Sequence, residues 1–327
     1  MPAYQRAAAS KRPLLGRLQL NSTTIMGNVA RWSWFGFQWR RAAKAQVNVS
    51  QIEGFLSSSL SSSVANIRAD FAPWFDAATA FNTLGMRVLP DVRADQSSNQ
   101  QLVSAALYGR LLTSFQTAFL LAERGLLADA RTVVRGAAES AIVLAAVAKD
   151  ATVCDLLIDR HFWHHRKLRQ AWLNDPQATA NMTAQEVDAV RAVITDADVQ
   201  HPKAKTLKND PVAIATLAQQ VGFMALYNAV YRSSSGDAAH TSIDALSRHI
   251  RADDQANITG LKFGPDVSDL PTTLSDAISV LGHALHSVTA YFKLAQFEDE
   301  LAQCAATWKA LGVPSDFRPG TAPTSAL

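Results

Sequence analysis

Seven polar residues in two distant stretches of the chain have the types and spacing to form one chemical centre. The first stretch, residues 126–149, is mostly apolar and carries Arg135 and Glu139 one helical turn apart. The second, residues 210–251, holds a polar elbow formed by Tyr231, Arg232, Ser235, Asp237 and His240. In that elbow the hydroxyls and the imidazole can donate hydrogen bonds, and the carboxylate can accept them.

The apolar surroundings of Arg135 and Glu139 predict that the two stretches meet. On a largely buried helix an ion pair costs several kcal/mol of desolvation unless further partners complete it. The polar elbow is the obvious source of such partners, so we expect a shared buried network inside one helical domain. The alternative is that both residues occupy unrelated surface positions, and the network itself could be purely structural.

Together the two stretches resemble an uncharacterised family of bacterial helical domains, and the resemblance covers about residues 100–300. It rests on Ala130, Arg131, Arg135 and Glu139 in the first stretch, and on Leu226, Tyr227, Tyr231, Arg232, Ser235 and His240 in the second. The interval from the serine to the histidine is one residue longer here than in that pattern.

That family is distantly similar to the HEPN class of helical domains, whose catalytic members are metal-independent ribonucleases of defence and toxin systems. The resemblance implies that His240 acts as general base on a ribose hydroxyl while Arg232 stabilises the charged phosphorane. Arg135, Glu139, Tyr231 and Ser235 would support that pair. It also implies RNA as a partner, a homodimer, and no cofactor. Seven residues separate Arg232 from His240, more than the four to six of the HEPN pattern.

Two other functions are compatible with these residues. The domain could be a non-catalytic helical module that binds a protein or a nucleic acid, with the polar cluster fixing helix register. It could also be a small-molecule enzyme. A metal centre at His161 and His165, four residues apart, lacks an evident third ligand, and the neighbouring arginines and lysine favour a solvated basic face. We therefore expect no bound metal.

Helical periodicity dominates the main body and predicts an all-α, multi-helix bundle around a central apolar helix. Expected helices cover residues 100–124, 126–149, 151–172, 183–198 and 271–308, and another begins at Asp210-Pro211. Gly125 is placed to cap the first of them, and Thr183 with Glu186 matches a capping box. The expected organisation is a basic, disordered leader over 1–50, a Ser-rich helix and irregular connection over 51–98, a helical domain over 99–309, and a flexible tail over 310–327.

Charge is unevenly distributed along the chain. The 327 residues carry 31 Lys and Arg against 28 Asp and Glu, but residues 1–44 contain eight basic residues and no acid. The leader could contact nucleic acid or a membrane surface, or it could have no binding role. The two cysteines, Cys154 and Cys304, are expected to be reduced, and no apolar run is long enough to span a membrane. We expect a cytoplasmic protein.

Overall fold

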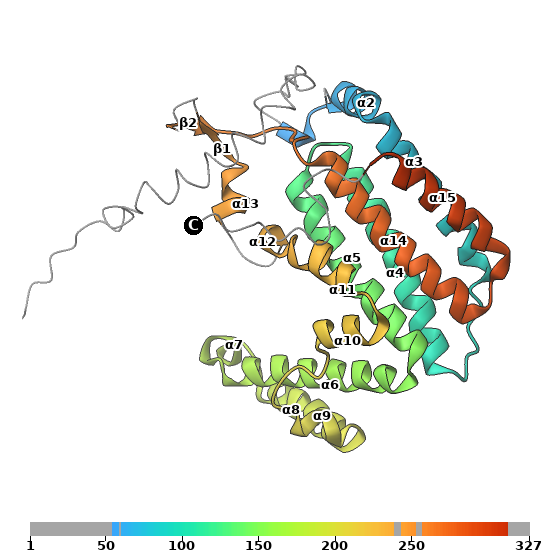
Figure 1. The fold of residues 1–327 in the computed structure, drawn as a ribbon. Helices are drawn as coiled ribbons and strands as arrows, with labels where there is room; N and C mark the ends of the chain where they lie inside the picture. Colours follow the sequence, from blue (N-terminus) through green and yellow to red (C-terminus); the bar gives the residue numbers. More distant parts are fainter. Residues whose placement is uncertain (1–53, 59, 239–242, 253–256, 313–327) are drawn as a thin grey trace, which may run out of the picture. The chain divides into compact units, whose positions relative to one another are not determined.

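The computed structural model describes residues 54–58, 60–238, 243–252 and 257–312, and its fold is all-α with one short hairpin (Figure 1). Residues 1–53 and the tail beyond 312 lie outside this part of the chain, as do the expectations made for the leader. The principal helices are α2 (Leu60–Asp70), α3 (Ala72–Val88), α4 (Asn99–Ala122), α5 (Leu127–Lys149), α6 (Ala151–Asn174), α8 (Ala184–Gln200), α10 (Ile214–Val221), α14 (Leu270–Phe292) and α15 (Glu298–Ala310).

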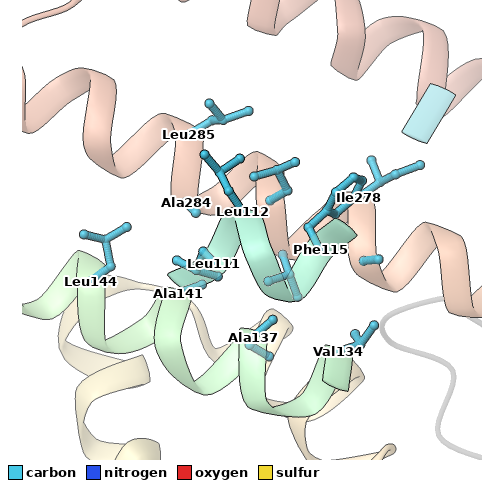
Figure 2. Packing of buried hydrophobic residues seen from close by; sticks show 14 of the residues in the cluster. Leu111, Leu112, Phe115, Val134, Ala137, Ala141, Leu144, Ile278, Ala284 and Leu285 are labelled. Carbon is cyan, nitrogen blue, oxygen red and sulfur yellow. The ribbon is translucent and has the colours of Figure 1, made fainter. Parts of the chain in front are cut away.

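The core forms around α5, which packs against α4 and α14. Small residues such as Ala137 and Ala141 on α5 allow these helices to approach, and larger side chains such as Leu111 on α4 and Ile278 on α14 fill the interior (Figure 2). Thirteen residues of α5 are buried, including an unbroken run from Ser140 to Val147. The expected central apolar helix is therefore confirmed.

The turn between α4 and α5 needs a glycine. Gly125 has a φ of 71°, and the Leu126 N–H reaches back to the Leu121 carbonyl at 2.9 Å, as in a Schellman cap. A Cβ at this position would lie 2.6 Å from Pro265. The predicted cap is confirmed, and the missing side chain of Gly125 also leaves room for Pro265 to pack against the turn.

The Ser-rich helix expected within residues 51–98 is α2, but the irregular connection expected after it is confined to residues 92–98, because α3 runs without interruption from Ala72 to Val88. Pro73 stands in the first turn, where its missing N–H costs nothing. Gly85 lies inside the helix where a Cβ would come within 2.6 Å of Leu112 Cδ2, and its carbonyl accepts a 2.8 Å hydrogen bond from Tyr108. Phe75, Phe81 and other α3 residues belong to the core, so the helical domain begins well before residue 99.

The single last helix expected over 271–308 is also corrected, since it is two helices. α14 ends at Phe292, where Lys293 adopts the left-handed conformation with a φ of 59°. α15 then turns back beside α3 and α14, where Arg87 pairs with Glu300 at 2.7 Å and the Trp308 indole donates to Ser275 at 3.2 Å. These tertiary contacts outweigh the continuous apolar pattern of the sequence.

A smaller group of helices follows α6. α7 (Pro176–Ala180), α8 and α9 (Pro202–Thr206) pack along α6. The predicted capping box is present, with Thr183 and Glu186 bonded reciprocally at the start of α8. α10 begins at Ile214, not at Asp210-Pro211, because the Asp210 carboxylate accepts the Val212 N–H and closes a local turn.

Residues 247–263 form a separate unit that contains the hairpin. Strands β1 (Ile250–Ala252) and β2 (Ile258–Leu261) pair antiparallel, with Ile250 opposite Leu261 and a register irregularity after Arg251. Cys154 and Cys304 are free, as expected. No helix among the described residues is both long and apolar enough to cross a membrane.

Candidate functional site

A π-helix carries the aromatic part of the candidate site. After α10 the chain turns at Gly222, whose φ is 79°, and continues through α11 (Met224–Leu226) into the π-helix η4 (Tyr227–Arg232). Leu226 and Val230 are buried and anchor this segment on the core. Tyr227 and Tyr231 lie beside each other with ring centroids 5.2 Å apart and planes 19° from parallel. π-helices are rare in proteins, and those that occur are frequently found at functional sites.

Arg135 joins this segment to α5. Its Nε donates to the Ser235 hydroxyl at 3.2 Å, and its Nη2 donates to the Tyr231 hydroxyl at 3.0 Å. The guanidinium carbon also lies 4.4 Å from the centroid of the Tyr231 ring, a cation–π distance. The predicted meeting of the two stretches is therefore confirmed at these three residues.

Glu139 has a different partner from the one expected. Among the described side chains it pairs with Arg160 of α6 at 3.5 Å, and Arg160 also contacts Asp210 at 3.0 Å. The Glu139 side chain is 28% exposed, so the expectation that Glu139 lies in a buried network is wrong. The reason is that α6 packs beside α5 and supplies a second arginine.

The electrostatics of the site keep the Tyr231 phenol neutral. Burial raises the pKa of Tyr231, Arg135 opposes that shift, and Glu139 adds to it. The phenol therefore keeps its proton while it accepts the Arg135 N–H. In this arrangement Arg135, Tyr231 and Ser235 are hydrogen-bonded to one another, as expected of residues with a structural role.

Arg232, the last residue of the π-helix, is exposed, unlike half-buried Tyr231 beside it. Ser234 is fully buried and its hydroxyl has no hydrogen-bond partner within the described part of the chain. His240 lies outside the described residues, and so does the Asp237 side chain. The structure thus places Arg232 at the surface without testing its pairing with His240.

No group of three His, Cys, Asp or Glu side chains in the described ranges is arranged to hold a metal ion. His161 and His165 lie on α6 with ring centroids 4.4 Å apart. The nearest further imidazole on α6, His164, lies 5.8 Å from His165, and the three rings follow one helix.

The sequence reasoning missed two ionisable groups. Arg160 appeared only as part of a basic run, yet it links α5, α6 and the loop before α10. Asp276 lies within the apolar pattern of α14 and is only 8% exposed; burial raises its pKa to about 7, while Arg131 opposes the shift. An acid in an otherwise apolar helix was the signal available for Asp276.

The fold and the contact of Arg135 with Tyr231 define a helical domain in which an arginine of the central helix anchors a π-helix. Residues 101–257 match the model of a family of unknown function, DUF5677. No curated protein and no solved structure matches the chain. The matched segment contains Arg135, Tyr231 and Arg232, whereas α3 and α14, which complete the core, lie outside it.

Proposed function

We propose that the domain is a metal-independent ribonuclease in which Arg232 and His240 act on RNA. The observation that carries the proposal is the exposure of Arg232, which pairs with no acid among the described residues. Arg232 is the last residue of a π-helix that Arg135 attaches to α5 through Tyr231. An exposed, unpaired guanidinium can bind a phosphate with two parallel hydrogen bonds. A cytoplasmic location, where RNA is accessible, is part of this proposal.

In the proposed reaction His240 removes the proton from a ribose 2′-hydroxyl, and the oxygen attacks the adjacent phosphorus. Arg232 stabilises the charge of the phosphorane. The bond from phosphorus to the 5′-oxygen of the next nucleotide breaks, and that oxygen takes the proton back from the His240 imidazolium. The products are a 2′,3′-cyclic phosphate and a 5′-hydroxyl. Arg135, Tyr231 and Ser235 are positioning residues that hold the π-helix. Two protomers in a homodimer would each supply one pair.

The test is incubation of the purified protein with total RNA in EDTA, alongside the variants Arg232→Ala and His240→Ala. Both should lose cleavage, because one removes charge stabilisation and the other removes the base. Arg110→Ala, which removes an exposed arginine of α4, is the matched control and should cleave normally. Equal cleavage by the parent and His240→Ala, or none by any protein, would remove the proposed role.

A non-catalytic binding module is the second candidate, and one observation favours it. Two nitrogens of Arg135 donate to Tyr231 and Ser235, and Glu139 pairs with Arg160, so the cluster is held by contacts within the domain. A cluster of that kind can fix helix register without reacting. Under this proposal the protein binds a partner or a nucleic acid, and the parent and the His240→Ala variant both leave RNA intact.

A further inference from the structure

Helix α6 carries an acid-free stretch that the candidate site does not use. Residues 160–174 read RHFWHHRKLRQAWLN, with four arginines or lysines, three histidines and no acid. Only Val153 and Cys154, near the start of this 24-residue helix, are buried. Most of the helix therefore has one side exposed to solvent, and the acid-free stretch makes that side basic.

Two of the four cations are neutralised within the domain. Arg160 pairs with Glu139 and Asp210, and Arg166 contacts Asp198 at 2.9 Å. Lys167 and Arg169 have no acidic partner within the described part of the chain. Lys167 instead lies over the Trp163 ring, 4.3 Å from its centroid. These two cations are available to an anionic ligand.

Apolar and aromatic side chains lie on the same side of the helix as the histidines. Trp172 is 52% exposed and Leu168 is 40% exposed. Leu168 follows His161 by seven residues and His164 by four, and Trp172 follows Leu168 by four, which places these side chains on one face. From His161 to Trp172 this face extends about 16 Å along the helix axis.

The local field on this face is positive. Burial lowers the pKa of His165, and the neighbouring charges of His161, Arg169 and His164 lower it further. The helix is held in place from its other side, where Phe162 stacks on His201 at 3.5 Å and the Trp163 indole donates to the Leu207 carbonyl at 3.0 Å. A fixed helix can present its aromatic and cationic groups without reordering.

We propose that this face of α6 binds single-stranded nucleic acid. Lys167 and Arg169, two residues apart, border this face on opposite edges and would contact phosphates. The exposed Trp172 ring, one turn from Arg169, would stack on a base. A membrane surface suits the face less well, because its apolar strip is interrupted by three histidines. The inference goes beyond the proposed cleavage, since binding here requires neither Arg232 nor His240.

Fluorescence anisotropy with a labelled oligouridine, in EDTA, tests the proposal on the full-length His240→Ala protein, in which cleavage cannot remove the probe. Lys167→Glu/Arg169→Glu should weaken binding about tenfold or more, and the slope of log affinity against log salt should become shallower by about 1.4. Trp172→Ala should weaken binding about fivefold or more through lost stacking. Circular dichroism verifies that each variant is folded.

Arg93→Glu/Arg110→Glu is the matched control, because it makes the same change in net charge at exposed residues away from α6. It should retain nearly all binding. Equal binding by this control and Lys167→Glu/Arg169→Glu would overturn the proposal, as would no binding of the probe by the parent. The proposal would also be overturned if polyglutamate displaced the probe and Trp172→Ala bound the probe as tightly as the parent. That result would identify an acidic peptide as the ligand.

Discussion

Arg135 contacts the Tyr231 side chain in two ways, through a 3.0 Å hydrogen bond to the phenol oxygen and through its guanidinium carbon, 4.4 Å from the ring centroid. The two residues are 96 positions apart, so the contact fastens the π-helix to the central helix of the core. Because Arg232 follows Tyr231 directly, its position depends on this attachment.

The first prediction concerns that attachment. Tyr231→Phe keeps the ring and removes the hydroxyl that accepts from Arg135, so it should lower the free energy of unfolding by about 1.5–3 kcal/mol. Urea denaturation of Tyr231→Phe, Arg135→Ala and the double variant should give a coupling energy of about 1 kcal/mol.

Tyr291→Phe is the control for the hydroxyl deletion. Tyr291 is half-buried like Tyr231, and its hydroxyl forms no hydrogen bond with the described residues. Its loss should change stability by less than about 0.5 kcal/mol. A coupling energy of zero between Arg135 and Tyr231 would mean that the π-helix is held by packing alone.

The second prediction concerns Glu139. Because its side chain is partly exposed and Arg160 keeps Asp210 as a partner, Glu139→Ala should cost less than about 1 kcal/mol. Glu139→Ala/Asp210→Ala should cost more than the sum of the single changes, since it leaves Arg160 without either acid. Chemical denaturation measures all three. Strict additivity would show that Arg160 does not couple the two acids.

The third prediction separates two glycines. Gly125→Ala should destabilise the protein by at least about 1–2 kcal/mol, because a φ of 71° disfavours alanine and its Cβ would lie 2.6 Å from Pro265. Gly136→Ala, within α5, meets no atom within 4 Å and should stabilise by about 0.5–1 kcal/mol. Thermal unfolding should therefore shift in opposite directions for the two variants.

These contacts show how far sequence patterns predict this fold. The apolar run of α5, the capping box of Thr183 and the glycine at 125 are local signals, and local signals fixed the all-α class and several helix ends. The meeting of Arg135 with Tyr231 was also predictable, because an arginine in an apolar helix needs partners that only a polar segment can supply.

The failures share one physical cause, which is that tertiary contacts override local pattern. An irregular connection was expected within residues 51–98, but Tyr108 and the core stabilise α3 there as a helix. The break at Lys293 leaves no mark in the apolar periodicity. The pairing of Glu139 with Arg160 depends on where α6 lies, and spacing within α5 carries no information about a neighbouring helix.

The last prediction uses Asp276, whose pKa is raised by burial to about 7. Between its ordinary pKa of 3.8 and about 7 the folded protein holds a proton that the unfolded chain has released. The stability contributed by this group is therefore full below about 3.8, falls as pH rises, and is lost by about pH 7. The total change is roughly 4 kcal/mol, since one pKa unit corresponds to about 1.4 kcal/mol.

Asp276→Asn removes this titration, so the difference in unfolding free energy between the variant and the parent should increase steadily from about pH 4 to pH 7 and then level off. Asp150→Asn gives the opposite sign, because hydrogen bonds from Thr152 lower the pKa of Asp150. There the contribution of the native carboxylate is present above its ordinary pKa and fades as pH falls. Urea melts across this pH range measure both trends, and a flat difference for Asp276→Asn would place that carboxyl in contact with water.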